Sequence, residues 1–288
     1  MKKLLFSLIL VLAACGALRK WGLTPEQKDD IARLDLAQII AESKLPDQAG
    51  MCDGTLFYGL RYYAITKLGQ KDSQFDFIAH LPQIVKNGEV FRSTDPTKCF
   101  NTSRDMVYGL LLALTVAPGD VARLYLSQMY SYWKAHDWHI TENCEPGKGC
   151  DNRRDVFYTG TDIPSNVPYL TGRVMAHHGM DVPDELKTAS AVDFPIPVPG
   201  FRQHLQAVQL AILMEIGEFD DRHLLAGKAL ASSQTKNAVF RALSGDRRRG
   251  YELLDEQFPD GRRPEYCQPY VYQRADSEAY DLCPGSDP

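Results

Sequence analysis

The sequence predicts an all-α protein made of stacked αα-hairpins that form a toroid or a partial toroid, with disulfide-bonded loops. Two observations predict this fold class. Apolar runs of roughly 10 to 17 residues dominate and alternating apolar–polar stretches are few, a pattern typical of helices. In addition, a helical segment rich in apolar residues runs four times into a glycine that is followed closely by an acidic residue.

Each of these glycines predicts the turn of a hairpin. Glycine adopts the left-handed conformation that ends many helices, and an acidic side chain is favourable at the start of the next helix. The glycines are Gly69, Gly119, Gly179 and Gly217, and the acids are Asp72, Asp120, Asp181 and Asp220.

The helices before and after a turn differ in character. Residues 106–112 are apolar almost all round, which predicts a helix surrounded by protein. The following helix has a one-sided stripe made of Val121, Leu124, Tyr125, Met129, Tyr132 and Trp133. Inner helices are therefore expected to alternate with outer helices, as in stacked hairpins.

The N-terminus has the layout of an export signal. Lys2 and Lys3 precede an apolar run over 4–12 that is too short to span a bilayer. The run leads into Ala13-Ala14-Cys15-Gly16, which resembles the lipobox of bacterial lipoproteins. The resemblance implies cleavage before Cys15, a palmitate-type lipid on Cys15 as membrane anchor, and a location in the bacterial cell envelope, either periplasmic or surface-exposed. An ordinary signal peptide followed by a chance cysteine is the alternative.

This layout divides the chain into a signal peptide (1–14), a lipidated tether (15–23) and a single α-helical domain (24–288) with a disulfide-held C-terminal tail. In an oxidising compartment the remaining cysteines predict three disulfides, and six cysteines allow 15 connectivities. Short separations favour pairing Cys144 with Cys150 and Cys267 with Cys283, which leaves Cys52 with Cys99. Their spacing does not favour a metal site, and no cofactor is expected.

The net charge of the chain limits the classes of partner that it is expected to bind. Removing residues 1–14 takes two lysines from the 32 basic residues, which leaves 30 against 37 acidic residues and a net charge of about −7. Nucleic acid is therefore not expected to bind. The membrane is expected as a partner only through the lipid anchor.

Reactive side chains are concentrated where the inner helices are expected to begin. If these helices run parallel, their N-terminal ends share one side of the domain. Asp53 and Asp105 are the candidate catalytic carboxylates, because glycoside hydrolysis needs two carboxyl groups about 5–10 Å apart. The candidate substrate-binding residues are Arg92, Arg104, Tyr108, Tyr169, Arg202 and His204.

A second resemblance rests on about 25 residues. Arg92-Ser93, followed by Ser103-Arg104-Asp105-Met106 opening an inner helix, looks like the mouth segments of α/α-toroid glycosidases and polysaccharide lyases. The resemblance implies a rim pocket that binds or cleaves a glycan, as a glycoside hydrolase or lyase would. The chain is short for six full hairpins, and no partner carboxylate for Asp105 is clearly marked.

A non-catalytic alternative to this function stays open. Asp53 and Asp105 stand where carboxylates cap helix starts, so both have a purely structural explanation. The domain is then a non-catalytic lipoprotein that binds an envelope protein partner.

Overall fold

The computed structural model describes residues 54–72, 75–95, 102–136, 166–187 and 201–257. This part of the chain is mostly helical, as predicted, and its two short strands, β1 (Val85–Lys86) and β2 (Glu89–Val90), pair antiparallel. The helices are α3 (Gly54–Lys67), α4 (Phe77–Ile84), α5 (Arg104–Val116), α6 (Gly119–Ala135), α7 (Val167–His177), α8 (Asp184–Lys187), α9 (Phe201–Glu215), α10 (Asp221–Ser233), α11 (Ala238–Leu243) and α12 (Arg247–Gln257).

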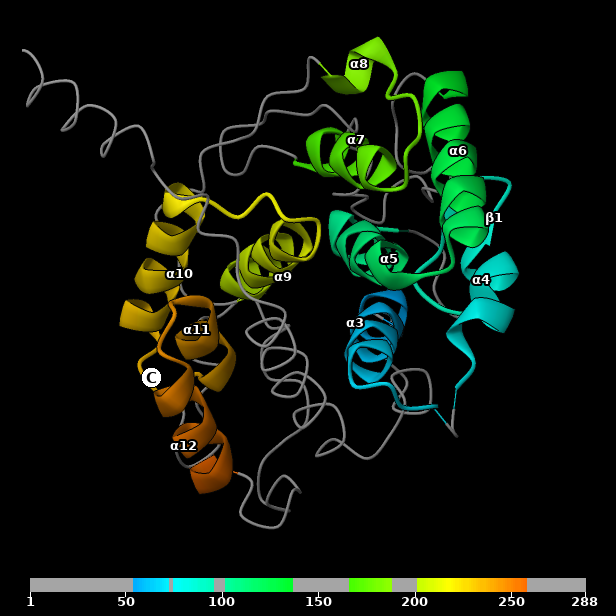
Figure 1. Cartoon of the computed structure of the whole chain (residues 1–288). Coiled ribbons are helices and arrows are strands. Elements are labelled where there is room, and N and C mark those ends of the chain that lie inside the picture. The colour runs from blue at the N-terminus through cyan, green and yellow to red at the C-terminus, as the bar shows by residue number, and fades with distance from the viewer. Residues whose placement is uncertain (1–53, 73–74, 96–101, 137–165, 188–200, 258–288) are drawn as a thin grey trace, which may run out of the picture.

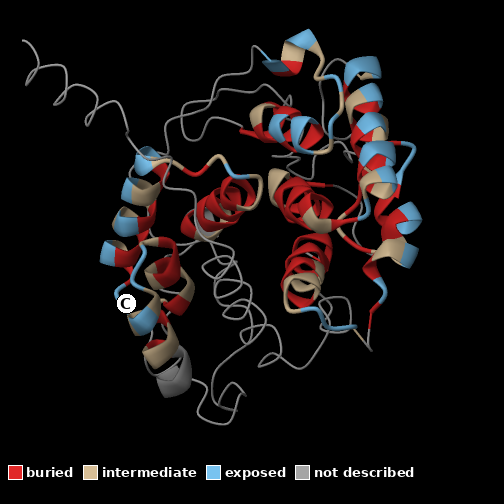
Figure 2. Cartoon of the chain, viewed as in Figure 1, coloured by how far each residue is buried: buried red, intermediate tan, exposed pale blue. Residues whose placement is uncertain are grey.

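The helices form an inner group and an outer group. Helices α3, α5, α7 and α9 lie in the middle of the described structure, while α4, α6, α8 and α10 lie outside them (Figure 1). Helix α5 is central and packs against α3, α7 and α9. The inner helices are largely buried, whereas the outer helices expose their outward sides (Figure 2).

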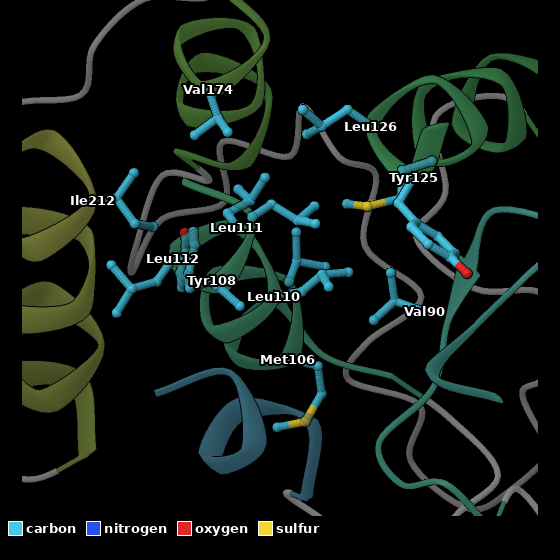
Figure 3. Packing of buried hydrophobic residues seen from close by; sticks show 14 of the residues in the cluster. Val90, Met106, Tyr108, Leu110, Leu111, Leu112, Tyr125, Leu126, Val174 and Ile212 are labelled. Carbon is cyan, nitrogen blue, oxygen red and sulfur yellow. The ribbon is translucent and has the colours of Figure 1, made fainter. Parts of the chain in front are cut away.

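Helix α5 forms the centre of the main hydrophobic core. Residues 106–115 are all buried, as the apolar run predicts. The side chains of Met106, Leu110, Leu111 and Leu112 leave α5 in different directions toward the surrounding helices (Figure 3). Each leucine buried in this way contributes about 1.5–3 kcal/mol to folding, so surrounding helix α5 on all sides is strongly favourable.

Helix α6 is one-sided, as its stripe predicts, with one exception. Tyr125, Met129 and Trp133 are buried against the core. Leu124, which the stripe includes, is 51% exposed, while Leu126 is fully buried. The predicted stripe therefore contains Leu124 where the structure buries Leu126. The two residues are equally apolar, and the packing of the neighbouring helices decides which of them faces inward.

Glycine allows α3 and α5 to cross closely. Gly59 and Gly109 are each the sixth residue of their helix. A Cβ atom on Gly59 would lie 2.1 Å from the carbonyl oxygen of Gly109, and a Cβ on Gly109 would lie 2.5 Å from the Cα of Leu56. No other residue fits at this crossing without moving the helices apart.

Three of the predicted turn glycines end their helices in the left-handed conformation. Gly69, Gly179 and Gly217 have φ values of 64°, 68° and 81°. In the first turn, the N–H of Gly69 donates to the carbonyl of Thr66 and the N–H of Gln70 donates to that of Ile65, both at 3.0 Å. This pair of bonds satisfies carbonyl groups that the end of the helix leaves open.

The prediction for Gly119 was wrong. The chain leaves α5 through extended residues, Ala117 (φ −71°, ψ 157°) and Pro118 (φ −50°, ψ 135°), and Gly119 is the first residue of α6. Proline disfavours helical geometry in the residue before it, so α5 ends without a left-handed residue. A turn of the predicted kind occurs instead at Gly245, after α11, where φ is 87°.

The described side chains form two main hydrophobic clusters that share α9. The first cluster contains side chains of α3 to α7 together with Val208, Ala211 and Ile212 of α9. The second contains side chains of α10 to α12 together with Leu210 and Met214 of α9. Helix α9 therefore joins the two groups of helices.

Candidate functional site

The inner helices α3 and α9 run in the same direction. Near their N-terminal ends, the Phe57 ring stacks on the His204 ring with 6.3 Å between centroids. Near their C-terminal ends, the Tyr63 hydroxyl donates to Oε2 of Glu215 at 3.0 Å. Both contacts join corresponding ends, so the starts of these helices lie on the same side of the domain.

Helices α5 and α7 follow the same direction. The backbone of Asn166, immediately before α7, hydrogen-bonds to the phenol of Tyr108 in the second turn of α5. At the other ends, Nε2 of His178 lies 2.7 Å from the carbonyl oxygen of Leu114.

Helix α7 is also parallel to α9, but displaced along it. Asn166 bonds to Gln209 in the middle of α9, and Arg173 pairs with Glu218 beyond the end of α9. The starts of α5 and α7 therefore lie beside α9, with the start of α7 farther along that helix.

Three buried polar side chains at these starts have no hydrogen-bond partner. Among the described residues, Oγ1 of Thr102, Oγ of Ser103 and Oδ1 of Asn166 are buried and unpaired. The residues are 1%, 4% and 6% exposed. Leaving such a group unpaired costs about 1–3 kcal/mol, and native proteins contain few of them, so these three atoms call for an explanation. We name Thr102, Ser103, Asp105, Tyr108, Asn166 and His204 the start cluster.

Asp105 is partly exposed in the first turn of α5. Its negative charge acts on Tyr108 and on His204, so it lies near both rings. Within the described residues its carboxylate makes no hydrogen bond or ion pair. Asp105 therefore does not cap its own helix through a side-chain hydrogen bond to a described residue, while its charge in the first turn still favours the helix dipole.

Tyr108 supplies a hydroxyl that keeps its proton. Burial, offset in part by Arg104 and by the Asn166 backbone, raises the pKa of Tyr108 to about 12. The phenol is therefore neutral at ordinary pH and can donate a hydrogen bond.

His204 is held neutral. Burial lowers its pKa to about 4, and the nearby charge of Asp105 opposes this only in part. A neutral imidazole can accept a proton or a hydrogen bond at one nitrogen and donate at the other. Its Nε2 is buried, while the residue as a whole is partly exposed.

Two of the three predicted arginines, Arg92 and Arg104, lie at the same helix starts. The backbone N–H of Thr55 donates to the carbonyl of Arg92 at 2.8 Å, which places the segment containing Arg92 beside the start of α3. Arg104, the first residue of α5, acts electrostatically on Tyr108.

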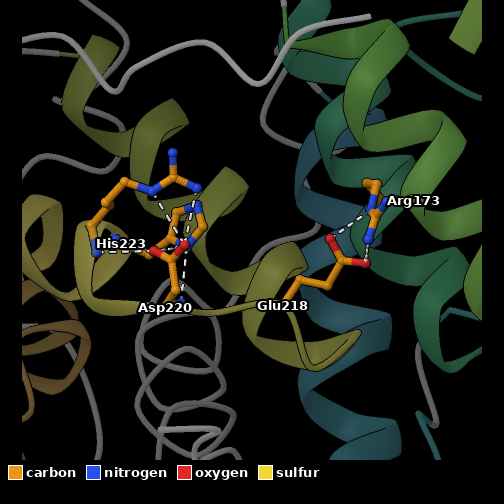
Figure 4. A network of polar contacts seen from close by, with 5 residues as sticks. Arg173, Glu218, Asp220 and His223 are labelled. Atoms are coloured by element: carbon orange, nitrogen blue, oxygen red, sulfur yellow. Dashed lines mark hydrogen bonds and ion pairs between the residues drawn. The ribbon is translucent and has the colours of Figure 1, made fainter. Parts of the chain in front are cut away.

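Tyr169 has different neighbours. Its pKa is raised, first by burial and then by the charge of Glu218, and Arg173 and Asp220 also act on it. These groups belong to a polar network between α7 and the connection from α9 to α10 (Figure 4). The structure thus groups Tyr169 with that connection, because α7 is displaced along α9.

Several predicted residues lie outside the part of the chain that the structure describes. These are Asp53, the side chain of Arg202, Cys15 and the six cysteines Cys52, Cys99, Cys144, Cys150, Cys267 and Cys283. Their predicted roles stay predictions.

The three unpaired groups could hardly be recognised from the sequence. Thr102, Ser103 and Asn166 belong to polar segments before helices, and hydroxyl and amide residues are common there as caps. Neither Ser103 nor Asn166 makes a side-chain cap bond to its helix. Only this tertiary observation separates them from ordinary capping residues.

The described residues contain no group of three or more His, Cys, Asp or Glu side chains placed to hold a metal ion. In the same residues, no helix is long and apolar enough to cross a membrane. Comparisons with models of protein families, with curated proteins and with solved structures found no match to this chain.

Proposed function

We propose that the start cluster binds a saccharide. The observation that supports this most directly is the set of three buried, unpaired oxygens of Thr102, Ser103 and Asn166. Sugar hydroxyls both donate and accept hydrogen bonds, so one ligand of this class satisfies hydroxyl and amide oxygens together. The Phe57 and His204 rings stack on each other near the starts of α3 and α9.

Cleavage of the bound glycan is the enzymatic form of this proposal. It requires two carboxyl groups, one protonated and one ionised. Asp105 supplies one beside Tyr108 and His204. Asp53, which comes immediately before the described start of α3 in the sequence, is the proposed second.

A toroid or partial toroid is the proposed complete architecture. Its support is the parallel direction of α3, α5, α7 and α9 and the position of α4, α6, α8 and α10 outside them (Figure 1). Proteins of this form place their ligands where the inner helices begin, as the resemblance of residues 92–106 implies.

The protein is further proposed to be an envelope lipoprotein anchored through Cys15. The basic start, the short apolar run and the lipobox-like residues support this. Labelling bacteria that express the full chain with a palmitate analogue tests it. The native chain should carry the label and Cys15→Ala should not, while label on both chains or on neither contradicts the proposal.

A binding and hydrolysis screen tests the saccharide proposal. The soluble chain starting at Gly16 is applied to a glycan array, and bound glycans are then examined for cleavage. Ser103→Ala should weaken binding about tenfold, since one hydrogen bond to ligand is worth about 1 kcal/mol or more. Asp105→Asn should retain binding and abolish any cleavage.

Ser232→Ala is the matched control. This substitution also removes a hydroxyl, but the Ser232 hydroxyl donates to the carbonyl of Lys228 within α10. The Ser232→Ala variant should bind glycans as tightly as the unmodified chain does. If no glycan is bound by the unmodified chain, the proposal is wrong and a protein partner becomes the better candidate.

A further inference from the structure

The hairpin of β1 and β2 turns at Asn87 and Gly88. The strands pair Lys86 with Glu89, so only these two residues form the turn. Their φ values are 55° and 92°, and Asn87 is the only described residue other than glycine with a positive φ. Positive φ at both central residues is the geometry of a type I′ turn, for which Asn-Gly is the preferred pair.

The two turn residues differ in their surroundings. Asn87 is exposed, and within the described residues its side-chain amide makes no hydrogen bond. Gly88 is buried against α6, where a Cβ atom on it would lie 2.1 Å from the carbonyl oxygen of Gln128 and 2.6 Å from Cβ of Tyr132. The turn therefore packs on α6 through Gly88, while the Asn87 amide is accessible to water.

These two residues can react with each other. The backbone nitrogen of Gly88 attacks the side-chain carbonyl carbon Cγ of Asn87, a succinimide ring closes, and the side-chain nitrogen leaves as ammonia together with the backbone amide proton. Water then opens the ring at either of its carbonyl carbons and leaves aspartate or isoaspartate. Glycine favours the attack because no side chain hinders its nitrogen. Water is the only co-reactant.

The packing of Gly88 on α6 opposes this attack. In the left-handed conformation of Asn87, the nitrogen of Gly88 points away from the Asn87 side chain, so ring closure requires rotation about the bond between Cα and the carbonyl carbon of Asn87. That rotation moves Gly88, which the contacts with Gln128 and Tyr132 hold in place. Ring closure therefore requires a local opening of the hairpin.

We propose that Asn87 is a site of spontaneous deamidation, through attack by the Gly88 nitrogen, and that it reacts when the hairpin separates from α6. Isoaspartate lengthens the main chain by one carbon, so the two-residue turn between Lys86 and Glu89 no longer fits. Modification thus converts a brief opening of the hairpin into a lasting one. This inference does not depend on the saccharide proposal.

A lasting opening affects the segment that contains Arg92. Strand β2 continues into Phe91 and Arg92, whose carbonyls accept hydrogen bonds from the hydroxyl and the N–H of Thr55 at 2.5 and 2.8 Å. The N–H of Phe91 also donates to the carbonyl of Ile84 at 2.8 Å. Separation of the hairpin from α6 is therefore expected to loosen the position of Arg92 beside α3.

Peptide mapping by mass spectrometry tests the proposal. The purified full chain is kept at mildly alkaline pH, either folded or in guanidinium chloride, and is then digested. The peptide that contains Asn87 should gain about one dalton in both samples, with isoaspartate among the products. The gain should be at least about tenfold faster in guanidinium chloride, because only opened molecules react. Equal rates overturn the role of α6, and a folded chain that is never modified at Asn87 overturns the site.

Asn237 is the internal control. Its Oδ1 accepts from the N–H of Phe240 at 3.0 Å, and Ala238 rather than glycine follows it. Its peptide should keep its mass in the folded chain, and an equal gain there would show unselective hydrolysis and overturn the proposal. The control variant is Asn87→Gly, which suits the same turn and has no side-chain amide, so it should show no gain.

Limited proteolysis tests the lasting opening. Phe91 is 9% exposed in the hairpin that packs on α6. Chymotrypsin cuts after aromatic residues, so it should cut the modified chain after Phe91 faster than the unmodified chain. The Asn87→Gly variant should be cut as slowly as the unmodified chain. Equal cutting of modified and unmodified chains would show that the hairpin returns to α6 after the reaction, and would overturn this part of the proposal.

Discussion

The hydroxyl of Tyr63 donates to the carboxylate of Glu215 at 3.0 Å, although the two residues are 152 positions apart in the chain. The bond joins the ends of α3 and α9 opposite the start cluster. Nζ of Lys67 lies 3.4 Å from the same carboxylate.

Removing this bond should destabilise the domain. Tyr63→Phe deletes only the hydroxyl, and a hydrogen bond to a charged group in a buried position is worth about 1.5–3 kcal/mol. The free energy of unfolding in urea should fall by about that amount. Tyr130→Phe is the control, because its hydroxyl meets Glu185 at 3.3 Å near the surface and should matter little. Equal losses in both variants would contradict the expectation.

The close crossing of α3 and α5 should not tolerate a methyl group. Gly59→Ala would place a Cβ atom 2.1 Å from the Gly109 carbonyl oxygen. The helices must separate, at a cost of about 3 kcal/mol in stability. Gly69→Ala, where φ is positive but no atom lies within 4 Å, should cost only about 1–2 kcal/mol. A thermal unfolding series of both variants measures this order, and the reverse order would show that the crossing is adaptable.

The capping box at the start of α10 should contribute measurably. Asp220 accepts from the backbone N–H groups of Arg222 and His223, and the His223 ring accepts from the N–H of Asp220. Asp220→Ala should lower the free energy of unfolding by about 1 kcal/mol. Asp184→Ala, which removes an exposed ion pair with Lys187, should change it much less. Calorimetric unfolding of both variants in low and high salt separates the two effects, since salt screens the exposed ion pair of Asp184 more than the hydrogen bonds of the capping box.

Acid should destabilise the domain partly through His204. Its pKa is lowered from 6.5 to about 4 by burial, so the unfolded chain takes up a proton at a higher pH than the folded chain. The resulting stability is fully present above pH 6.5 and is lost as the pH falls toward 4. His204→Phe should therefore show a shallower loss of stability over that range. Parallel curves for the two proteins in urea titrations would refute this role.

The helical turns were largely predictable because they depend on local chemistry. Gly69, Gly179 and Gly217 follow long apolar runs, and each adopts the expected left-handed conformation. Gly119 failed because a neighbouring proline, not the glycine, sets the geometry there. Gly245 was missed because the short helix before it lacks a long apolar run.

The candidate site was predictable only in part. Residues at helix starts could be named from the sequence, and the structure brings Tyr108, Asp105 and His204 close together. The unpaired state of Asn166 could not be predicted, since it depends on Gln209, which lies 43 residues further along. Tyr169 could not be placed either, because the displacement of α7 along α9 follows from side-chain packing between helices.

Because α9 belongs to two hydrophobic clusters, the last three described helices are an obligatory part of the domain. A chain ending after α9 would leave Leu210 and Met214 facing water on a helix whose opposite side stays packed. Such a fragment would expose an apolar stripe on α9 to solvent and would aggregate. Shortening of this protein from its C-terminal side into α10, α11 or α12 is therefore expected to destabilise the domain.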